Sequence, residues 1–211
     1  MSTDGGRTVS GGQLPPLAPL RDVPFYRAVA KPSPWTFEIP QIREFMSQYV
    51  SAGGKGWADP FSGRSTIAEY TNDLRRDTPA SHPHHLAADR FSAALPYGLE
   101  GVLFDPPYSY RQVTECYRGV GLRARQIDTS SNFYTRVRVQ LAPRVRIGGL
   151  ALSFGWNSNG FGRYQGFEAI DGLLVSFGGH HNDTIVTVER KVAEGPPAPP
   201  IREPLSRIHV E

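Results

Sequence analysis

The chain contains a single cysteine, only three lysines and no long hydrophobic run among its 211 residues. One cysteine excludes an internal disulfide and a cysteine-cluster zinc site, and we expect Cys116 to be a small buried residue. No stretch approaches the roughly 18 uninterrupted apolar residues of a membrane span, and the amino terminus lacks the charged-then-apolar order of a signal peptide. We therefore expect a cytoplasmic protein without a membrane partner.

The scarcity of lysine makes 20 of the 23 basic residues arginines, although the formal net charge is only +3. Over residues 109–149 the acidic residues are only Glu115 and Asp128. Because the planar guanidinium group suits phosphate, this segment predicts a phosphate-binding surface, with a solvated helix face as the alternative. Its arginines are Arg111, Arg118, Arg123, Arg125, Arg136, Arg138, Arg144 and Arg146, and we take the first four as candidates for nucleic-acid binding.

Composition divides the chain into one domain and two tails. Residues 1–22 are rich in Gly, Ser, Pro and Thr, and residues 193–211 are rich in proline, so neither segment can bury enough apolar surface to fold. We expect both tails to be disordered. Residues 23–192 should form a single domain, because a chain of this length leaves no room for two full modules.

Hydrophobic periodicity predicts an α/β fold. Helical spacing of apolar residues predicts helices over 39–50 and 131–145. The alternation of these helices with short apolar runs implies a mostly parallel sheet, whose strands we expect at 56–59, 67–71, 101–104 and 150–154. Residues 170–190 contain two β-rich runs around the turn sequence GGHHND, which predicts an antiparallel hairpin at the edge of the sheet.

Acidic residues stand at or just after the ends of three predicted strands, at Asp59, Asp73 and Asp105. Parallel sheets bind ligands beyond the carboxyl ends of their strands. Gly63, in the string DPFSG, permits close backbone approach to a ligand, and Asp73 falls where a carboxylate can accept both hydroxyls of a ribose. An ordinary turn and a helix-capping aspartate are the alternatives for these two positions.

The sequence Asp105-Pro106-Pro107-Tyr108 follows an apolar strand directly. Two consecutive prolines remove two amide donors, so the Asp105 carboxylate and the Pro106 carbonyl can both face a ligand as acceptors. This arrangement predicts a receptor for an amino group, and Tyr108 adds an aromatic face on which a base can stack. A strand that leaves the sheet through a proline turn is the alternative, but it explains neither the acid nor the aromatic residue.

Taken together, the motifs of residues 34–191 resemble the amino-methyltransferases of DNA, specifically the small adenine methyltransferases of phages and prokaryotes. The catalytic motif of that family is similar to LFDPPY. The other similar segments are PSPWTFEIPQI over the methionine end of the cofactor, WADPFSGRST as the glycine motif, TNDL as the ribose motif, LAADRFSAAL as the segment whose acid contacts the cofactor adenine, and LALSFGWNSNGFG and GGHHNDTIVTVERK as the late strands.

The resemblance implies a Rossmann-like class I methyltransferase sheet that binds S-adenosylmethionine and transfers its methyl group to N6 of adenine in duplex DNA, with the base flipped. It implies the cytoplasm of a prokaryotic or phage-infected cell as the location. Cytosine-N4 methylation of DNA, methylation of RNA and a catalytically silent nucleic-acid-binding module remain alternatives. The implied catalytic residues are Asp105, Pro106, Pro107 and Tyr108, and the implied cofactor-binding residues are Phe37, Asp59, Pro60, Phe61, Gly63, Ser65, Asp73, Asp89 and Phe91.

Two departures from the family have structural consequences. Ser65 stands where the family usually has a second glycine, so one close backbone approach is either missing or replaced by a hydroxyl contact. Too few residues separate Asp59 from Asp73 for the usual crossover, so the first helix should be short, irregular or absent. No separate target-recognition domain fits in the chain. We therefore expect sequence choice to come from loops at about 109–130 and 156–166, and we expect no metal site.

Overall fold

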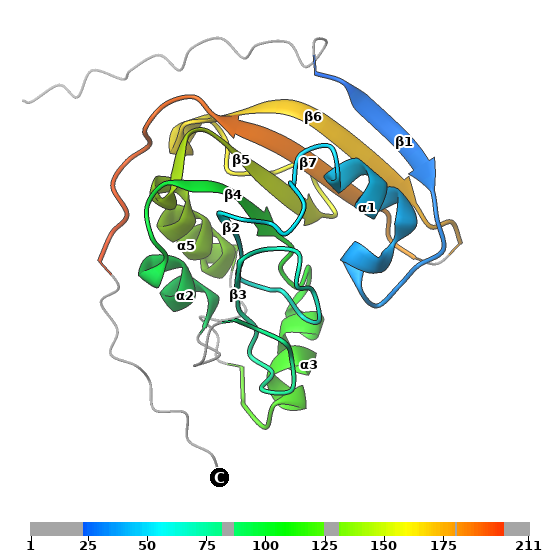
Figure 1. The fold of residues 1–211 in the computed structure, drawn as a ribbon. Helices are drawn as coiled ribbons and strands as arrows, with labels where there is room; N and C mark the ends of the chain where they lie inside the picture. Colours follow the sequence, from blue (N-terminus) through cyan, green and yellow to red (C-terminus); the bar gives the residue numbers. More distant parts are fainter. Residues whose placement is uncertain (1–22, 82–86, 125–130, 180, 201–211) are drawn as a thin grey trace, which may run out of the picture.

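The computed structural model describes residues 23–81, 87–124, 131–179 and 181–200. A seven-stranded sheet with the order β1-β6-β7-β5-β4-β2-β3 forms the centre of this part of the chain (Figure 1). Strand β7 pairs antiparallel with β5 and β6, and all other neighbours are parallel. The strands are β1 (Phe25–Val29), β2 (Trp57–Asp59), β3 (Tyr70–Thr71), β4 (Leu99–Phe104), β5 (Val145–Gly155), β6 (Phe167–Ser176) and β7 (Thr184–Lys191).

This topology confirms the predicted α/β fold class, with a Rossmann-like sheet that is mostly parallel and carries a C-terminal antiparallel hairpin. The described helices are α1 (Pro40–Met46), α2 (Ala88–Ala94), α3 (Tyr110–Gly119) and α5 (Ser131–Leu141). Short 3₁₀ turns occupy Thr36–Glu38, Ala142–Arg144 and Arg163–Gln165. None of the helices in the described ranges has the length and apolarity that crossing a membrane requires.

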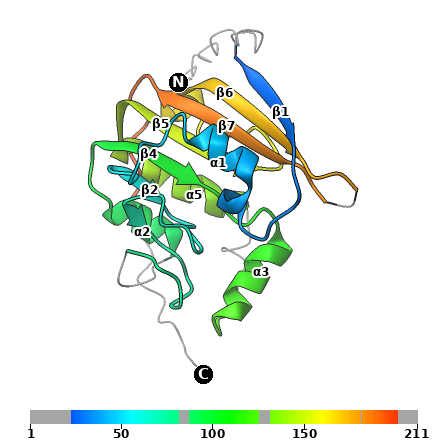
Figure 2. The ribbon, with the colours of Figure 1, turned by 45° about the vertical axis from the view of Figure 1, so that its right-hand side comes forward.

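The two faces of the sheet are covered by different helices. Ile42, Phe45 and Met46 of α1 have helical spacing and pack on one face in the same apolar cluster as Leu103 and Leu152. The other face is covered by α2 and α5, whose apolar side chains form a second cluster with Val102, Phe104 and Ala151. In both ribbon views α3 stands apart from the other helices and extends from the carboxyl end of β4 (Figures 1 and 2).

Several predicted boundaries differ from those observed. The helix predicted over 39–50 ends at Met46, and the residues that follow it form hydrogen-bonded turns. The strand predicted over 67–71 is only Tyr70–Thr71, because the preceding residues form part of an irregular loop. As predicted, no helix lies between β2 and β3. The tail predicted at 193–211 has neither helix nor strand over 193–200, and residues 1–22 and 201–211 lie outside the described residues.

Three elements were not predicted, namely α2, β1 and α3. Strand β1 pairs in parallel with β6 and forms the outer edge of the sheet, so the β6–β7 hairpin lies inside the sheet and not at its edge as expected. Helix α3 occupies the first half of the segment expected to be a loop at 109–130. A capping box begins this helix, because the Ser109 hydroxyl accepts the Gln112 N–H while the Gln112 side chain accepts the Ser109 N–H. That serine-x-x-glutamine pattern was present in the sequence and predicts a helix start.

We expect Gly101→Ala to destabilise the protein. Gly101 of β4 pairs with the buried Trp57 of β2, and a Cβ at this position would lie 2.6 Å from the indole ring. Overpacking of this kind typically costs about 1–3 kcal/mol, which urea unfolding would measure. Gly119→Ala is the matched control, since a Cβ at Gly119 meets nothing within 4 Å and alanine favours a helix. Equal stabilities of the two variants would contradict the packing argument.

Candidate functional site

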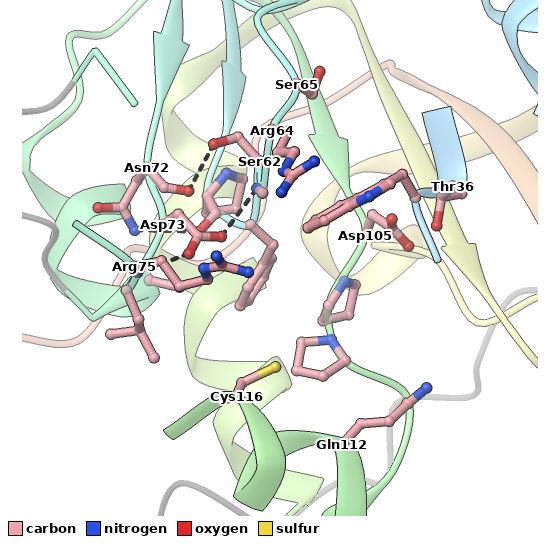
Figure 3. A pocket seen from close by; sticks show the side chains of 18 of the residues that line it. Thr36, Ser62, Arg64, Ser65, Asn72, Asp73, Arg75, Asp105, Gln112 and Cys116 are labelled. Carbon is pink, nitrogen blue, oxygen red and sulfur yellow. Dashed lines mark hydrogen bonds between the residues drawn. The ribbon is translucent and has the colours of Figure 1, made fainter. Parts of the chain in front are cut away.

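A cavity of about 800 Å³ opens at the carboxyl ends of β2, β3 and β4. Its wall consists of the loops that follow these strands, the Pro34–Glu38 segment before α1, and one side of α3. Figure 3 shows Asp73 and Arg75 on one side of this cavity and Thr36 and Asp105 on the other. Because the three strands are parallel, their carboxyl ends meet at one edge and bring together residues that lie far apart in the sequence.

The 60–67 loop after β2 is held by backbone and side-chain hydrogen bonds instead of a helix. Ser62 N–H donates to the Asn72 carbonyl at 2.9 Å, and the Asn72 side chain donates to the Pro60 carbonyl at 3.2 Å. Gly63 has φ +54°, and a Cβ there would lie 2.9 Å from the Trp35 ring. The Ser65 hydroxyl accepts the Ile67 N–H at 3.3 Å. The loop thus keeps a fixed shape that brings backbone close to the cavity.

Asp73 connects this loop to the chain after β3. One carboxylate oxygen accepts the Gly63 N–H at 2.9 Å, and the other accepts the Arg75 N–H at 2.8 Å (Figure 3). The side chain also lines the cavity. Asp73 is therefore positioned to accept hydrogen bonds from ligand hydroxyls, and it also holds the 60–67 loop in place.

Asp59 ends β2 with a side chain that is fully buried. Its Oδ1 accepts the Phe61 N–H at 3.0 Å, and its Oδ2 has no hydrogen-bond partner among the described residues. Burial raises the pKa of the Asp59 carboxyl well above its usual range, and the charges of Asp105 and Asp73 raise it further. Asp59 lies beneath the cavity, whereas the neighbouring Pro60 and Phe61 line it.

Asp105 follows β4 and faces the cavity. The Tyr108 hydroxyl donates to Asp105 Oδ1, and Thr36 also hydrogen-bonds to this carboxylate. Burial raises the pKa of Asp105 to about 6, although the bonds from Tyr108 and Thr36 oppose the rise. The structure thus places a carboxyl group with a raised pKa directly after the end of β4.

The backbone after Asp105 is fixed by contacts from two helices. The Gln112 side chain of α3 accepts the N–H groups of Tyr108 and Ser109 at 2.7 and 3.1 Å. The Tyr134 hydroxyl of α5 donates to the Pro107 carbonyl. Pro106 and Pro107 line the cavity beside Asp105. The motif is therefore held by contacts from both of its neighbouring helices.

The other predicted cofactor residues have different surroundings. Phe37 is buried, lines the cavity, and packs edge-to-face on Phe154 with ring centroids 5.0 Å apart. Asp89 and Phe91 of α2 are not among the residues that line the cavity. Phe91 is part of the apolar core, and Asp89 lies 3.7 Å from Arg136 in an ion pair. The structure therefore brings Phe37 to the cavity but gives Asp89 and Phe91 contacts within the protein.

The predicted nucleic-acid-binding arginines lie on or after α3. Arg111 pairs with Glu115 one turn along the helix, at 2.7 Å. Arg118 and Arg123 are exposed, and Arg125 lies outside the described residues. Arg111 and Arg118 thus belong to the helix that begins just after Tyr108, and Arg123 follows that helix.

Four later arginines of the segment have intramolecular partners. Arg144 donates to the carbonyls of Ala93 and Leu95 at the end of α2, and Arg146 pairs with Glu100 at 2.5 Å. Arg136 pairs with Asp89, and Arg138 donates to carbonyls of the loop after β5. The excess of arginine in 109–149 therefore reflects structural contacts as well as an exposed basic surface.

Cys116 is exposed and lines the cavity, so the expectation that it is a buried apolar residue is wrong. It lies on the same face of α3 as Gln112, one turn away, and Figure 3 shows both beside the cavity. Partial burial raises the pKa of its thiol, as do the charges of Asp73 and Glu115. The expectation failed because α3 was not recognised as a helix with one face toward the cavity.

Two further residues beside the site were not predicted. Thr36, in the 3₁₀ turn before α1, contacts Asp105. Trp156, just after β5, packs on Tyr108 with ring centroids 5.6 Å apart. Neither position has a sequence pattern of its own, since each contact joins distant parts of the chain. Within the described ranges, no three His, Cys, Asp or Glu side chains gather as metal ligands would.

No protein-family model matches the chain, and no curated protein has a significantly similar sequence. Similar solved structures include TrmN from Thermus thermophilus (16% identity, TM-score 0.49), an rRNA methylase from Streptococcus thermophilus (6%, 0.46) and a Streptococcus mutans protein in complex with SAH (11%, 0.40). The matches cover 73%, 72% and 70% of this chain and 49%, 95% and 93% of the others, so the chain spans about half the length of TrmN. At these identities the similarities assign no activity to the chain.

Proposed function

We propose that the chain is an S-adenosylmethionine-dependent methyltransferase that methylates N6 of adenine in DNA. The observation that supports this most strongly is the arrangement around one cavity. A glycine loop held by Asp73 lies on one side, and the acceptor-rich sequence Asp105–Tyr108 lies on the other. Transfer between two bound molecules needs such a site, because both must be held in line within one cavity.

The residues present fit the proposed cofactor. Gly63 allows backbone to approach a ligand closely, and Asp73 offers acceptor oxygens to a ribose. Asp59 has a buried oxygen without a partner among the described residues, directly before the cavity-lining Pro60 and Phe61. S-adenosylmethionine would supply a methyl group attached to a positively charged sulfur. The cavity of about 800 Å³ falls within the range of small-molecule sites.

Asp105 is the proposed acceptor for the amino group of adenine. The lone pair of that nitrogen is delocalised into the ring, so the enzyme must orient the group instead of only removing a proton. In the structure the Tyr108 hydroxyl occupies Asp105 Oδ1, and an amino N–H would take its place. After methyl transfer the nitrogen must lose one proton, and a carboxylate with a pKa of about 6 is suited to receive it near neutral pH.

Duplex DNA is the proposed partner, with the adenine flipped from the stack. The exposed Arg118 and Arg123 lie on or just after the helix that follows the catalytic motif, so a strand whose base enters the cavity would run past them. Arg111 and Arg125 stay candidates for the same role, Arg125 on the sequence alone. Cytosine-N4 methylation, RNA methylation and a catalytically silent binding module are the alternatives that the experiments below distinguish.

Asp73→Ala should weaken S-adenosylmethionine binding, because it removes the proposed ribose acceptor and releases the Gly63 N–H. Isothermal titration calorimetry would measure the dissociation constant, and we expect it to rise at least tenfold. Glu100→Ala is a matched control, since its carboxylate pairs with Arg146 and neither residue lines the cavity. An unchanged affinity of the Asp73 variant would remove the cofactor assignment of this residue.

Asp105→Ala should abolish turnover while cofactor binding stays nearly intact. Losing one preorganised polar contact typically costs about a hundred- to a thousandfold in rate. A labelled-methyl transfer assay on unmodified duplex DNA would measure it, followed by digestion to nucleosides to identify the modified base. We expect N6-methyladenine. If the wild-type protein modifies cytosine, or transfers methyl groups to RNA alone, that base or nucleic acid replaces the proposed substrate. If the wild-type protein binds the cofactor but transfers no methyl group, the silent binding module is supported.

The rate of methyl transfer should fall as the pH falls through about 6, because the Asp105 carboxylate is then protonated. Tyr108→Phe removes a hydrogen bond that lowers the pKa of Asp105, so this pKa should rise in the variant. The acid limb of the pH–rate profile should therefore move to higher pH. Tyr110→Phe, at a mostly exposed tyrosine, serves as the control. A limb that stays in place or moves to lower pH in the Tyr108 variant would contradict the proposed pairing.

A further inference from the structure

The loop after β5 brings a large aromatic side chain to the catalytic motif. Trp156 is 43% exposed, and its ring is inclined at 56° to the ring of Tyr108 with centroids 5.6 Å apart. Trp156 is not among the residues that line the cofactor cavity, whereas Tyr108 is. Tyr108 and Trp156 therefore form one aromatic surface next to the cavity, and Trp156 is partly exposed to solvent.

This loop, residues 156–162, is clamped by a buried carboxylate. Glu189 of β7 is 4% exposed, and its two oxygens accept the N–H groups of Phe161 and Gly162 at 2.6 and 2.8 Å. A Cβ at Gly160 would lie 1.9 Å from Glu189 Oε2, so the close approach needs glycine. Arg138 of α5 donates to the Gly160 carbonyl at 2.6 Å. Side chains from two elements thus fix the backbone of one short loop.

The clamp uses groups that are costly to bury. Burial raises the pKa of Glu189 and lowers that of Arg138, so desolvation opposes the charge on each side chain. Phe161 packs into the apolar core, with its ring centroid 5.7 Å from that of Phe104 and 5.0 Å from that of Phe167. A surface connection between two strands needs no such fixation. The clamp holds residues 160–162, and Trp156 stands between this clamped end of the loop and the end of β5.

We propose that Trp156 is a specificity-determining residue that stacks on the acceptor base, and that Glu189 is the positioning residue that holds it there. This inference rests on the proposed function and deepens it. The Tyr108 hydroxyl donates to Asp105, so both rings lie next to the carboxylate that the amino group would reach. A planar heterocycle whose amino group reaches Asp105 would therefore lie beside the two rings. A flexible aliphatic amine has no flat face for stacking, so an unstacked nucleobase is the substrate that this surface fits.

Substitutions at Trp156 test the stacking surface through the KM for DNA. Stacking of a base on an aromatic ring supports about a ten- to a hundredfold change in affinity, so Trp156→Ala should raise the KM for DNA by that factor. Trp156→Phe keeps a ring and should stay within about threefold of wild type. Tyr97→Ala, at an exposed aromatic residue before the start of β4, is the matched control. A Trp156→Ala variant with wild-type KM, or a Phe variant as weak as the Ala variant, would overturn the proposal.

Glu189→Gln tests the positioning part. Glutamine has the same size but offers one acceptor oxygen for two N–H donors, so the loop should lose its fixed shape. The variant should show the same rise in KM as Trp156→Ala with unchanged S-adenosylmethionine affinity. The double variant should be no worse than either single variant, because both changes remove one contact. Effects that multiply in the double variant would show that Glu189 acts independently of Trp156.

A binding readout separates this inference from the proposed reaction. A single-stranded DNA oligonucleotide of mixed sequence, added to the cofactor-saturated protein, should quench tryptophan fluorescence, and Trp156→Phe should lose most of the quenching. If wild-type protein methylates no base but shows this quenching, the reaction assignment fails and the stacking surface stands. If wild type methylates adenine and Trp156→Phe retains the full quenching, the stacking surface is overturned and the reaction assignment stands.

Discussion

The parallel pairing of β2 with β3 and β4 is the constraint on which the candidate site depends. Ala58 pairs with Val102 on one side and with Tyr70 on the other, so the three strands end at the same edge. A slip of one residue would move every side chain of a strand to the opposite face and would take Asp59 or Asp105 away from its neighbours. Gly101 secures this register, because only a residue without a side chain leaves room for the Trp57 indole.

In the connection between β2 and β3, polar side chains fix the backbone, whereas a longer crossover would contain a helix. Ten residues separate β2 from β3, and their shape is maintained by Asn72 and Asp73. On the other side of the cavity, the Gln112 side chain and the Tyr134 hydroxyl fix the backbone after the prolines. The site is thus built from short connections whose conformations are determined by individual hydrogen bonds.

The sequence was sufficient to predict the features that depend on local pattern. The apolar strand before Asp105, the missing crossover helix and the C-terminal hairpin all follow from spacing and turn residues within a few positions. Helix α3 was also predictable, since the Ser109–Gln112 capping box is a local signal, but its mostly polar sequence shows only Val113 fully buried. Missing it led to the wrong environment for Cys116.

The contacts that complete the site could not be predicted, because they join residues far apart in the chain. Trp156 meets Tyr108 across 48 positions, and Glu189 reaches the loop that carries Trp156 from another strand. Strand β1 pairs with β6 at a separation of about 147 residues. Such pairings depend on the packing of the whole sheet, so the hydrophobic periodicity of a single segment does not predict them.

The brevity of β2 and β3 has a consequence for how the molecule responds to its ligands. Strands of three and two residues contribute few ladder hydrogen bonds, so we expect the cavity side of the sheet to open locally at a lower free energy than the long β5, β6 and β7 ladder. A ligand that binds only the locally folded form adds RT ln(1 + [L]/Kd) to that local free energy. Amide hydrogen exchange in this region should therefore slow as the ligand concentration rises.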